Sequence, residues 1–346
     1  MHRVASRSAG ARRSSADRAP AVHRQFGLSD SEALDLYYQM LVSRRLSEHA
    51  LRLAFQGSID VAIPSDGHEA AQIASMRALR PTDPVYLFYR SAPAAYARGL
   101  TAREIFLDYF GRADAPSSGG KNLAGHWAKR ELNLMSISGS VATQIPNAVG
   151  SALAAKLRGE DTVCVAYFGD GGSSKSDFHE GLNFAAVHQL PVILFCENNG
   201  LAISVPFEKQ SGVRSVADRA VGYALVGISV DGADPLQVYR VMREAVDGAR
   251  AGHGPALIEA RVQRLGQHTS QVGDLRTAKV VAAAARHSDP IPRFARYLRH
   301  VGLLDDARDA ELAERADAEV VDGVEYARQA SVPPVERAFQ DVYTTP

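Results

Sequence analysis

The spacing of apolar residues near the start of the chain predicts a helix between Ser29 and Gly57. Ser29 and Glu32 fit a capping box, in which each side chain bonds the other residue's backbone N–H. Gly57 is a natural helix stop. One face of the expected helix carries Leu34, Tyr37, Tyr38 and Leu41.

The next hundred residues give weaker patterns. We expect a loop around Pro64 and Gly67, a helix over residues 69–79 and a short strand over residues 85–89. Residues 115–125 are rich in Ser and Gly and are typical of a surface loop.

From residue 138 onward, apolar runs of strand length alternate with helical patterns. The expected strands are 162–168, 191–196, 227–230 and 256–261. The expected helices are 141–157, 177–188, 236–250, 291–301 and 306–330. This alternation predicts an α/β fold with a mostly parallel central sheet, helices on both of its faces, and extra helices at both ends of the chain.

Composition narrows the class of protein. A chain of 346 residues with 46% hydrophobic and 23% charged residues can bury a large core. A formal net charge of +0 does not favour nucleic acid or an anionic membrane, and no apolar run approaches the roughly 20 residues of a spanning helix. Cys164 and Cys196 both lie in apolar runs and are interpreted as buried thiols.

The first residues differ from the rest of the chain. They contain one acid, Asp17, against Arg3, Arg7, Arg12, Arg13, Arg18 and Arg24. This composition is typical of a disordered bacterial tail, which indicates a cytoplasmic protein, or of a transit peptide, which indicates the mitochondrial matrix. We therefore divide the chain into a basic tail, 1–27, and a single domain, 28–346, with a C-terminal helical extension.

Two oxygen-bearing residues follow neighbouring predicted strands. Asp170 lies between Gly169 and Gly171 after the first strand, and Asn199 follows the second. A strand, a crossover helix and a return strand fit between them, so both side chains should meet at the carboxyl edge of the sheet, where ligands bind. A carboxylate, an amide and close-approaching glycines suit a divalent cation that carries phosphate.

These residues belong to motifs that resemble a known family. Gly169-Asp170-Gly171 with Asn198-Asn199 is similar to the thiamine diphosphate motif of transketolase-like enzymes. From about Leu28 to Leu304 the chain resembles α subunits of 2-oxo acid dehydrogenases, in the branched-chain and bacterial pyruvate groups. The resemblance is carried by Leu87-Phe88-Tyr89-Arg90, by residues 138–146 and 199–204, and by Asp289-Pro290-Ile291.

The resemblance implies a thiamine-diphosphate-binding fold and a set of cofactor contacts. It assigns Mg²⁺ to Asp170, the Asn199 side chain and the backbone carbonyl of Leu201, where relatives often have Tyr or Phe. It assigns the diphosphate to Tyr89, Arg90, Gly171 and Gly172, and the thiamine to Gly139 and Val141. In the branched-chain group, the residues matching Ser138, Ser140, Thr143 and Gln144 hold a potassium ion. The alternative is that these polar residues only cap the N-terminus of the helix that follows, because a capped helix start has a similar sequence.

Two histidines match family positions. His268 aligns with the active-site histidine, and imidazole can donate a proton near neutral pH during acyl transfer. His126 matches a histidine near the active-site entrance. After His268 the chain departs from relatives, because the Ser-Asp-Asp and later Tyr-Arg of their ordered loop are replaced by Gln271-Val272-Gly273-Asp274-Leu275-Arg276. This change puts loop ordering and lipoyl docking in doubt. Thr269 sits where some animal relatives carry a regulatory phosphoserine.

The chain has one metal-diphosphate domain and lacks the second domain that supplies a glutamate to the aminopyrimidine. The resemblance implies that a β subunit supplies it in an α2β2 tetramer, and that a lipoyl acyltransferase accepts the acyl group. Glu69 matches a structural glutamate of α subunits and is not assigned the role.

The motifs favour different substrates. The motifs at 142–146 and 199–204 favour a branched-chain 2-oxo acid. Glu197, where branched-chain relatives often have Arg, favours pyruvate, and acetoin is a further alternative. A different class of function is a cofactor-binding but non-catalytic paralogue, supported by the altered loop after His268 alone.

Overall fold

The computed structural model describes residues 21–340 and has at its centre a five-stranded parallel sheet of order β1-β2-β3-β7-β6. The strands are β1 (Val85–Tyr86), β2 (Cys164–Gly169), β3 (Val192–Asn198), β6 (Val226–Asp231) and β7 (Ala256–Arg261), with a small hairpin of β4 (Leu201–Ala202) and β5 (Val205–Pro206). The helices of the described chain are α1 (Val22–Gln25), α2 (Asp30–Phe55), α3 (Glu69–Arg77), α4 (Ala92–Arg98), α5 (Ala102–Tyr109), α6 (Gln144–Arg158), α7 (Ser176–Val187), α8 (Phe207–Gln210), α9 (Pro235–Arg250), α10 (Ala278–Ser288), α11 (Pro290–His300) and α12 (Asp306–Gln329).

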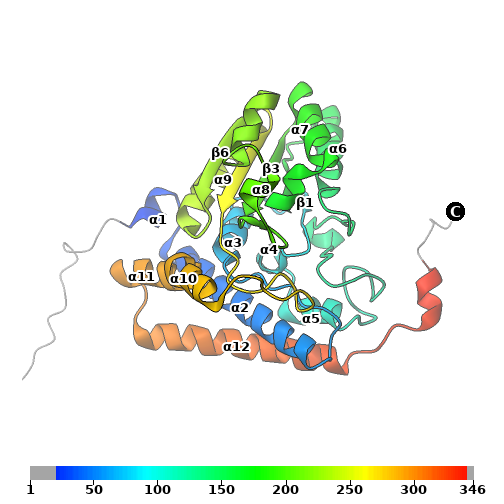
Figure 1. Ribbon diagram of the computed structural model, residues 1–346, viewed down its shortest axis with the longest axis vertical. Coiled ribbons are helices and arrows are strands. Elements are labelled where there is room, and N and C mark those ends of the chain that lie inside the picture. Colours follow the sequence, from blue (N-terminus) through cyan, green and yellow to red (C-terminus); the bar gives the residue numbers. More distant parts are fainter. Residues whose placement is uncertain (1–20, 341–346) are drawn as a thin grey trace, which may run out of the picture.

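The sheet separates two hydrophobic cores because successive side chains of a strand point to opposite faces. In β2, Val165 and Tyr167 belong to the core on one face, whereas Ala166 and Phe168 belong to the core on the other. Helices α6 and α7 cover one face of the sheet, and α9 and α3, which pack against each other, cover the other (Figure 1). The predicted α/β fold with a parallel sheet between two helical layers is confirmed, and it explains why β2 and β3 are apolar up to Glu197 and Asn198 at the end of β3.

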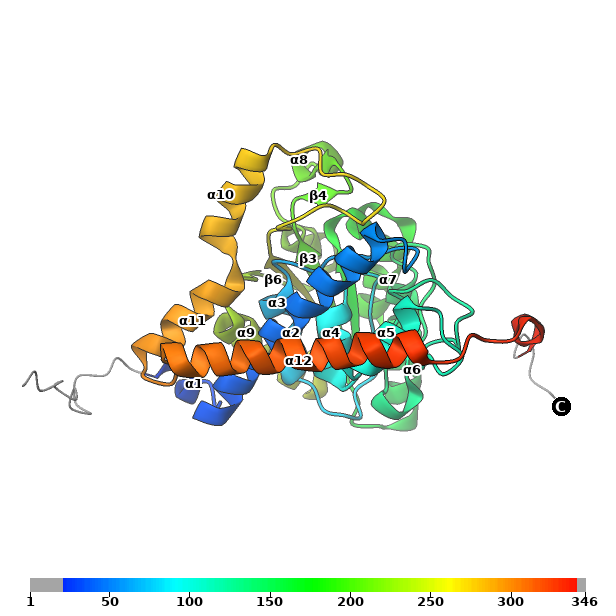
Figure 2. The same ribbon diagram turned by 90° about the horizontal axis from the view of Figure 1, so that it is seen from below.

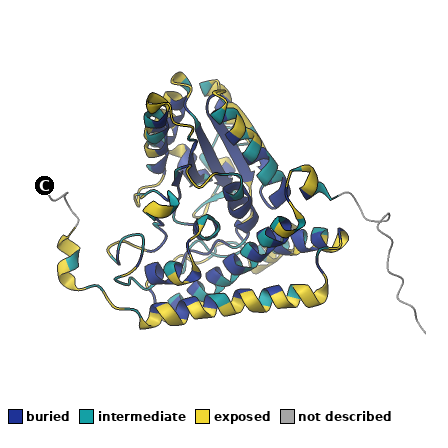
Figure 3. Cartoon of the chain, turned by 180° about the vertical axis from the view of Figure 1, so that it is seen from behind, coloured by how far each residue is buried: buried dark blue, intermediate teal, exposed yellow. Residues whose placement is uncertain are grey.

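Further helices, α2, α5 and α12, pack against α3 and α4 on the side away from the sheet. The long helix α12 lies against α2 and α5, along the lower edge of the molecule in Figure 1 and across the face turned to the viewer in Figure 2. Its inner face is buried and its outer face is exposed, whereas the central strands are buried throughout (Figure 3). The predicted helices at both ends of the domain are therefore present.

Several predicted bounds are wrong. The basic tail was expected to reach residue 27, but Val22–Gln25 form α1, where His23 is buried and its ring bonds Tyr297 Oη at 2.6 Å and Asp30 Oδ1 at 2.9 Å. Residues 1–20 lie outside the described residues. The first strand ends at Tyr86 rather than Tyr89, because Ser91 N–H bonds the carbonyl of Phe88 and closes a turn.

Helix α6 begins at Gln144 rather than at Val141 as expected. Ala142 has φ +78°, a left-handed value that a right-handed helix cannot contain. Helices α4, α5 and α10 were not predicted. In α10 no residue is buried, although the helix carries apolar residues such as Val280 and Val281, so packing within the described chain does not account for them.

Other predictions hold for the part of the chain that is described. Cys164 and Cys196 are buried free thiols. The segment 115–125 contains neither helix nor strand, although Ala115 and Ala124 are buried. None of the helices within 21–340 is both long and apolar enough to span a membrane.

Asp108 in α5 tests how the segment 115–125 packs, because it contacts Ser117 of that segment. Its Oδ2 accepts a hydrogen bond from Ser117 Oγ at 2.7 Å. Burial raises the pKa of Asp108 to about 7, although the Ser117 bonds lower it. Because the folded-state pKa lies above the ordinary value of 3.8, the stability of the fold falls as the pH rises from about 4 to about 7.

The substitution Asp108→Asn keeps an oxygen acceptor for Ser117 and removes the buried charge. At about 1.4 kcal/mol per pKa unit, discounted for relaxation, we expect the variant to be more stable than the wild type by about 1–2 kcal/mol at pH 8. The gain should vanish near pH 4. Urea unfolding at both pH values measures it, and a gain that does not depend on pH would contradict the assignment of a buried charge.

Candidate cofactor and active site

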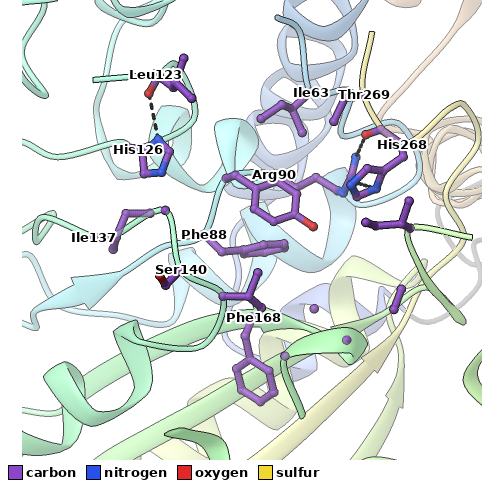
Figure 4. Close-up of a pocket in the computed structure, with 18 of the residues that line it drawn as sticks. Ile63, Phe88, Arg90, Leu123, His126, Ile137, Ser140, Phe168, His268 and Thr269 are labelled. Atoms are coloured by element: carbon purple, nitrogen blue, oxygen red, sulfur yellow. Dashed lines mark hydrogen bonds between the residues drawn. The ribbon is translucent and has the colours of Figure 1, made fainter. Parts of the chain in front are cut away.

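A cavity of about 630 Å³ opens at the carboxyl ends of β2 and β3 (Figure 4). This volume lies within the range of roughly 300–1,000 Å³ typical of small-molecule sites. Its walls come from the turn after β1, the loop before α6, the segments after β2 and β3, and the loop around His268. The cavity therefore occupies the position at which open parallel sheets bind ligands.

Asp170 and Asn199 both line this cavity, as predicted. Strands β2 and β3 pair in parallel with Gly169 opposite Glu197, so the two strands end at the same edge of the sheet. Asp170 opens the short 3-10 helix η3 (Asp170–Ser174) directly after β2. The predicted meeting of the two side chains at one edge is confirmed; the metal that they would share is a proposal.

The Asp170 carboxylate is suited to a cation. Only 1% of the residue is exposed, and burial raises its pKa. The contacts that lower the pKa are the Gln210 amide, whose Nε2 lies 3.1 Å from Oδ2, and backbone N–H groups. A buried carboxylate whose hydrogen bonds come from neutral groups gains much from a bound cation.

The hairpin of β4 and β5 forms the adjoining wall and carries Leu201. The Leu201 N–H donates to Asn199 Oδ1 at 3.1 Å, which joins two of the expected metal ligands. At the tip of the hairpin, Ile203 has φ +57°, a costly value for a β-branched residue. Its carbonyl accepts bonds of 3.1 Å from both Nη atoms of Arg264, and these bonds hold the strained conformation.

The glycines after β2 leave room where a side chain would collide. A Cβ added to Gly171 would lie 2.9 Å from the Cβ of Ala202. A Cβ on Gly172 would lie 3.5 Å from Val141 Cγ1, which brings the loop before α6 against η3. Both glycines and Val141 line the cavity, so the backbone after Asp170 can approach a diphosphate closely.

The loop before α6 carries the residues expected to face thiamine and potassium. Gly139, Ser138, Ser140 and Gln144 line the cavity, whereas Thr143 does not. Thr143 Oγ1 donates to the Ser140 carbonyl at 2.9 Å, and the Ser140 N–H donates to Ser138 Oγ at 3.0 Å. Gln144 Nε2 donates to the Tyr167 carbonyl at 2.8 Å. These bonds keep the loop compact, and the potassium site remains a prediction.

Tyr89 and Arg90 lie in the cavity wall after β1. Arg90 is 1% exposed, and its Nη1 donates to the carbonyls of Pro64 at 2.6 Å and His268 at 3.1 Å. Its Nη2 lies 3.0 Å from His268 Nδ1. These bonds use three of the five N–H donors that a guanidinium has, so two remain for an anion in the cavity.

The arginine bonds fix the protonation of His268. Nδ1 lies 3.0 Å from Arg90 Nη2 and 3.3 Å from Arg264 Nη1, and arginine can only donate. Nδ1 therefore carries the lone pair and Nε2 carries the proton. Burial, and then the charges of Arg90 and Arg264, lower the pKa of His268 to about 4, so the ring is neutral at pH 7. Tyr89 packs edge-on to this ring, with centroids 6.0 Å apart.

Arg264 is a site residue that the sequence did not reveal. It is 3% exposed, and burial, Arg90 and Arg276 lower its pKa to about 10. Its guanidinium bonds Ile203 and His268, as described above. Arg264 does not itself line the cavity, but its charge repels that of Arg90, so an anion bound at Arg90 would offset part of this repulsion.

His126 stands on the opposite side of the cavity from His268 (Figure 4). Its Nδ1 lies 2.9 Å from the Leu123 carbonyl, which can only accept, so Nδ1 carries the proton. A Cβ added to Gly139 would lie 3.4 Å from Nε2, which places the second ring nitrogen beside the expected thiamine-facing loop.

The altered loop after His268 has defined contacts. Ser270 exchanges bonds with Ala62, with its N–H donating to the Ala62 carbonyl at 2.8 Å and its Oγ accepting from the Ala62 N–H at 2.9 Å. Arg276 donates to the carbonyls of Arg264 and Gly266, each at 2.7 Å, and pairs with Asp274. Asp274 and Arg276 therefore hold this loop in place, although its sequence differs from that of relatives. Thr269 lines the cavity.

Comparison with known proteins identifies close relatives. The chain matches the Dehydrogenase E1 component family over residues 37–336. It is 40% identical, over 93% of its length and 98% of the relative, to the 2-oxoisovalerate dehydrogenase subunit alpha of Bacillus subtilis strain 168. It is 36% identical, over 85% of its length and 77% of the relative, to the pyruvate dehydrogenase E1 component subunit alpha of Staphylococcus aureus strain Mu50. A mitochondrial 2-oxoisovalerate dehydrogenase subunit alpha 2 of Arabidopsis thaliana is 32% identical over 92% of this chain and 68% of the relative.

The substitution Asp170→Ala tests the metal assignment. We expect it to abolish Mg²⁺-dependent binding of thiamine diphosphate, because the cation would lose its only carboxylate ligand from this chain. Calorimetry on the full chain with its β subunit measures the binding. Asp177→Ala in α7 is the matched control and should bind normally, because Asp177 does not line the cavity. Unchanged affinity in Asp170→Ala would show that the assignment is wrong.

The protonation of His268 is directly measurable. In protein with labelled histidine, the His268 ring should titrate near pH 4 by NMR, with His268→Gln used to assign its signal. Arg264→Met removes one of the charges that lower the pKa, so the midpoint should rise toward the ordinary value of 6.5. A wild-type midpoint at 6.5 would contradict the proposed arginine environment.

Proposed function

Because the chain belongs to the dehydrogenase E1 component family as an alpha subunit, we propose that it acts on a branched-chain 2-oxo acid. The reaction is loss of CO₂ from the 2-oxo acid, followed by transfer of the remaining group as an acyl group to a lipoyl group, whose disulfide would be the two-electron oxidant and would be reduced to thiols. The observation that carries the proposal is the cavity that joins Asp170 and Asn199 at one edge of the sheet with Arg90 and His268.

The residues of the cavity fit a metal-bound diphosphate. A buried carboxylate, an amide and the Leu201 carbonyl on one side would hold Mg²⁺. The guanidinium of Arg90 and the N–H groups of Gly171 and Gly172 would hold the phosphates, with Tyr89 beside them. Thiamine diphosphate, when bound, supplies the electron sink for loss of the carboxyl group of a 2-oxo acid. Ser138, Ser140, Thr143 and Gln144 remain the proposed potassium ligands.

His268 would act as a hydrogen-bond donor at this site. Its proton sits on Nε2, because Arg90 and Arg264 occupy Nδ1. A neutral imidazole that donates from Nε2 can stabilise negative charge that develops on an oxygen in the cavity. His126, protonated on Nδ1, would present an accepting Nε2 from the opposite wall.

A β subunit would complete the site. Apolar side chains at the cavity are left open, with Leu123 64%, Ile203 51% and Val141 42% exposed. Apolar side chains gathered at an open site are typical of a surface that a partner covers. The β subunit would also supply the glutamate for the aminopyrimidine, and a lipoyl acyltransferase would accept the acyl group.

The cavity lining supports an aliphatic substrate. Ile63, Phe88, Leu123 and Ile137 contribute to its wall (Figure 4). This lining, together with the 40% identity to the relative from Bacillus subtilis, favours a branched-chain 2-oxo acid. Pyruvate is the second candidate, because Glu197 matches the pyruvate group and the Staphylococcus relative is almost as similar.

A substrate comparison tests the proposal. The α and β subunits are co-expressed and supplied with Mg²⁺, thiamine diphosphate and an artificial electron acceptor. We expect 2-oxoisovalerate to give a kcat/KM at least about tenfold above that of pyruvate, which corresponds to the 1–3 kcal/mol that extra methyl groups contribute in an apolar pocket. Higher kcat/KM for pyruvate would favour the second candidate. Bound cofactor without turnover of any 2-oxo acid would indicate a non-catalytic paralogue.

A further inference from the structure

Behind Asn199 lies a buried group of polar side chains that has no assigned role. Glu197, His68 and Gln72 are each 0% exposed. His68 is the N-cap residue of α3 and Gln72 follows one turn later, so both face the Glu197 carboxylate at the end of β3. The distances to Glu197 Oε2 are 2.6 Å from His68 Nδ1 and 2.8 Å from Gln72 Nε2.

The chemistry of the atoms fixes the direction of each hydrogen bond. Asn199 Nδ2 lies 3.4 Å from His68 Nε2, and an amide nitrogen can only donate. His68 Nε2 must therefore carry the lone pair, which places the ring proton on Nδ1. That proton points at Glu197 Oε2, which accepts it. The chain of bonds runs in one direction, from Asn199 through His68 to Glu197.

The Leu201 N–H, which donates to Asn199 Oδ1, fixes the amide orientation independently of His68, and the His68 lone pair stabilises the same orientation. If the amide were flipped, Oδ1 would oppose the lone pair of His68 Nε2, and two acceptors would repel each other. In the observed orientation Oδ1 is turned away from His68 and accepts the Leu201 N–H. An amide oxygen has two lone pairs, so one remains for a ligand in the cavity that Asn199 lines.

Packing alone does not explain this group. Glu197 Oε1 has no hydrogen-bond partner among the described residues, and a buried oxygen in that state is costly. The placement of His68 is also demanding. Gly67 before it has φ +93°, and a Cβ there would lie 1.9 Å from the Gln263 carbonyl oxygen. Such costs are typical of residues that serve a site.

We propose that His68 and Glu197 are positioning residues that hold the Asn199 amide with its oxygen toward the metal. The inference rests on the proposed function, because it assumes that Asn199 is a metal ligand. Groups that orient a metal ligand typically contribute about 10–100-fold to metal affinity. The expected loss on breaking the chain of bonds therefore lies in that range.

The test measures metal affinity without turnover. Mn²⁺ replaces Mg²⁺, and its binding to the full chain with its β subunit and thiamine diphosphate is followed by electron paramagnetic resonance. His68→Leu keeps the volume but can neither accept from Asn199 nor donate to Glu197. We expect it to weaken Mn²⁺ binding about 10–100-fold.

His68→Gln is the matched control. Its amide oxygen can accept from Asn199 while its N–H group donates to Glu197, so it should restore Mn²⁺ affinity to near the wild-type value. Rescue by Gln separates orientation of the amide from a general effect on the fold. Equal Mn²⁺ affinity in wild type and His68→Leu, or equal loss in the Leu and Gln variants, would overturn the proposal.

A second measurement needs no folded Leu variant. In wild-type protein labelled with ¹⁵N-histidine, the His68 ring should show a proton on Nδ1 and a bare Nε2, with His68→Gln used for assignment. A ring protonated on Nε2 would overturn the inference. Failure of the proposed function is distinguishable, because the wild type itself would then bind no Mn²⁺ in the presence of thiamine diphosphate.

Discussion

The parallel pairing of β2 with β3 is the constraint on which the site depends. Gly169 lies opposite Glu197 in this pair, so Asp170 and Asn199 leave the sheet at the same edge. The pairing in turn requires α7 to cross over between the strands, on the same face of the sheet as α6. A shift of the register by one residue would turn one strand's side chains to the opposite core and separate the two ligands.

Positive and negative side chains lie on different sides of the cavity. Arg90 and Arg264 are buried on the side of His268, and their charges lower the pKa of its imidazole. Asp170 is buried on the side of the sheet, where burial raises its pKa. A cation that carries a diphosphate would match both sides, because the cation neutralises the carboxylate and the phosphates neutralise the arginines.

The sequence predicted those parts of the site that follow directly from strand ends. Asp170 and Asn199 were found because each follows a recognisable apolar strand. The same rule, applied to β7, would have pointed to Arg264, which follows Arg261 by three residues. His68 and Gln72 could not be found in this way, because a helix from another part of the chain brings them to Glu197. The late start of α6 depends on one backbone angle and leaves no hydrophobic pattern to recognise. Helix α10 does carry apolar residues, but none of them is buried in the described chain.

The position of the metal tests the central claim most directly. Crystals of the α and β subunits with thiamine diphosphate and Mn²⁺ would give an anomalous difference peak at the metal. One peak is expected in the cavity, at roughly 2.0–2.3 Å from an Asp170 carboxylate oxygen, Asn199 Oδ1 and the Leu201 carbonyl oxygen. A metal bound away from Asp170 and Asn199, with the diphosphate in place, would contradict the claim that the paired strand ends build the site.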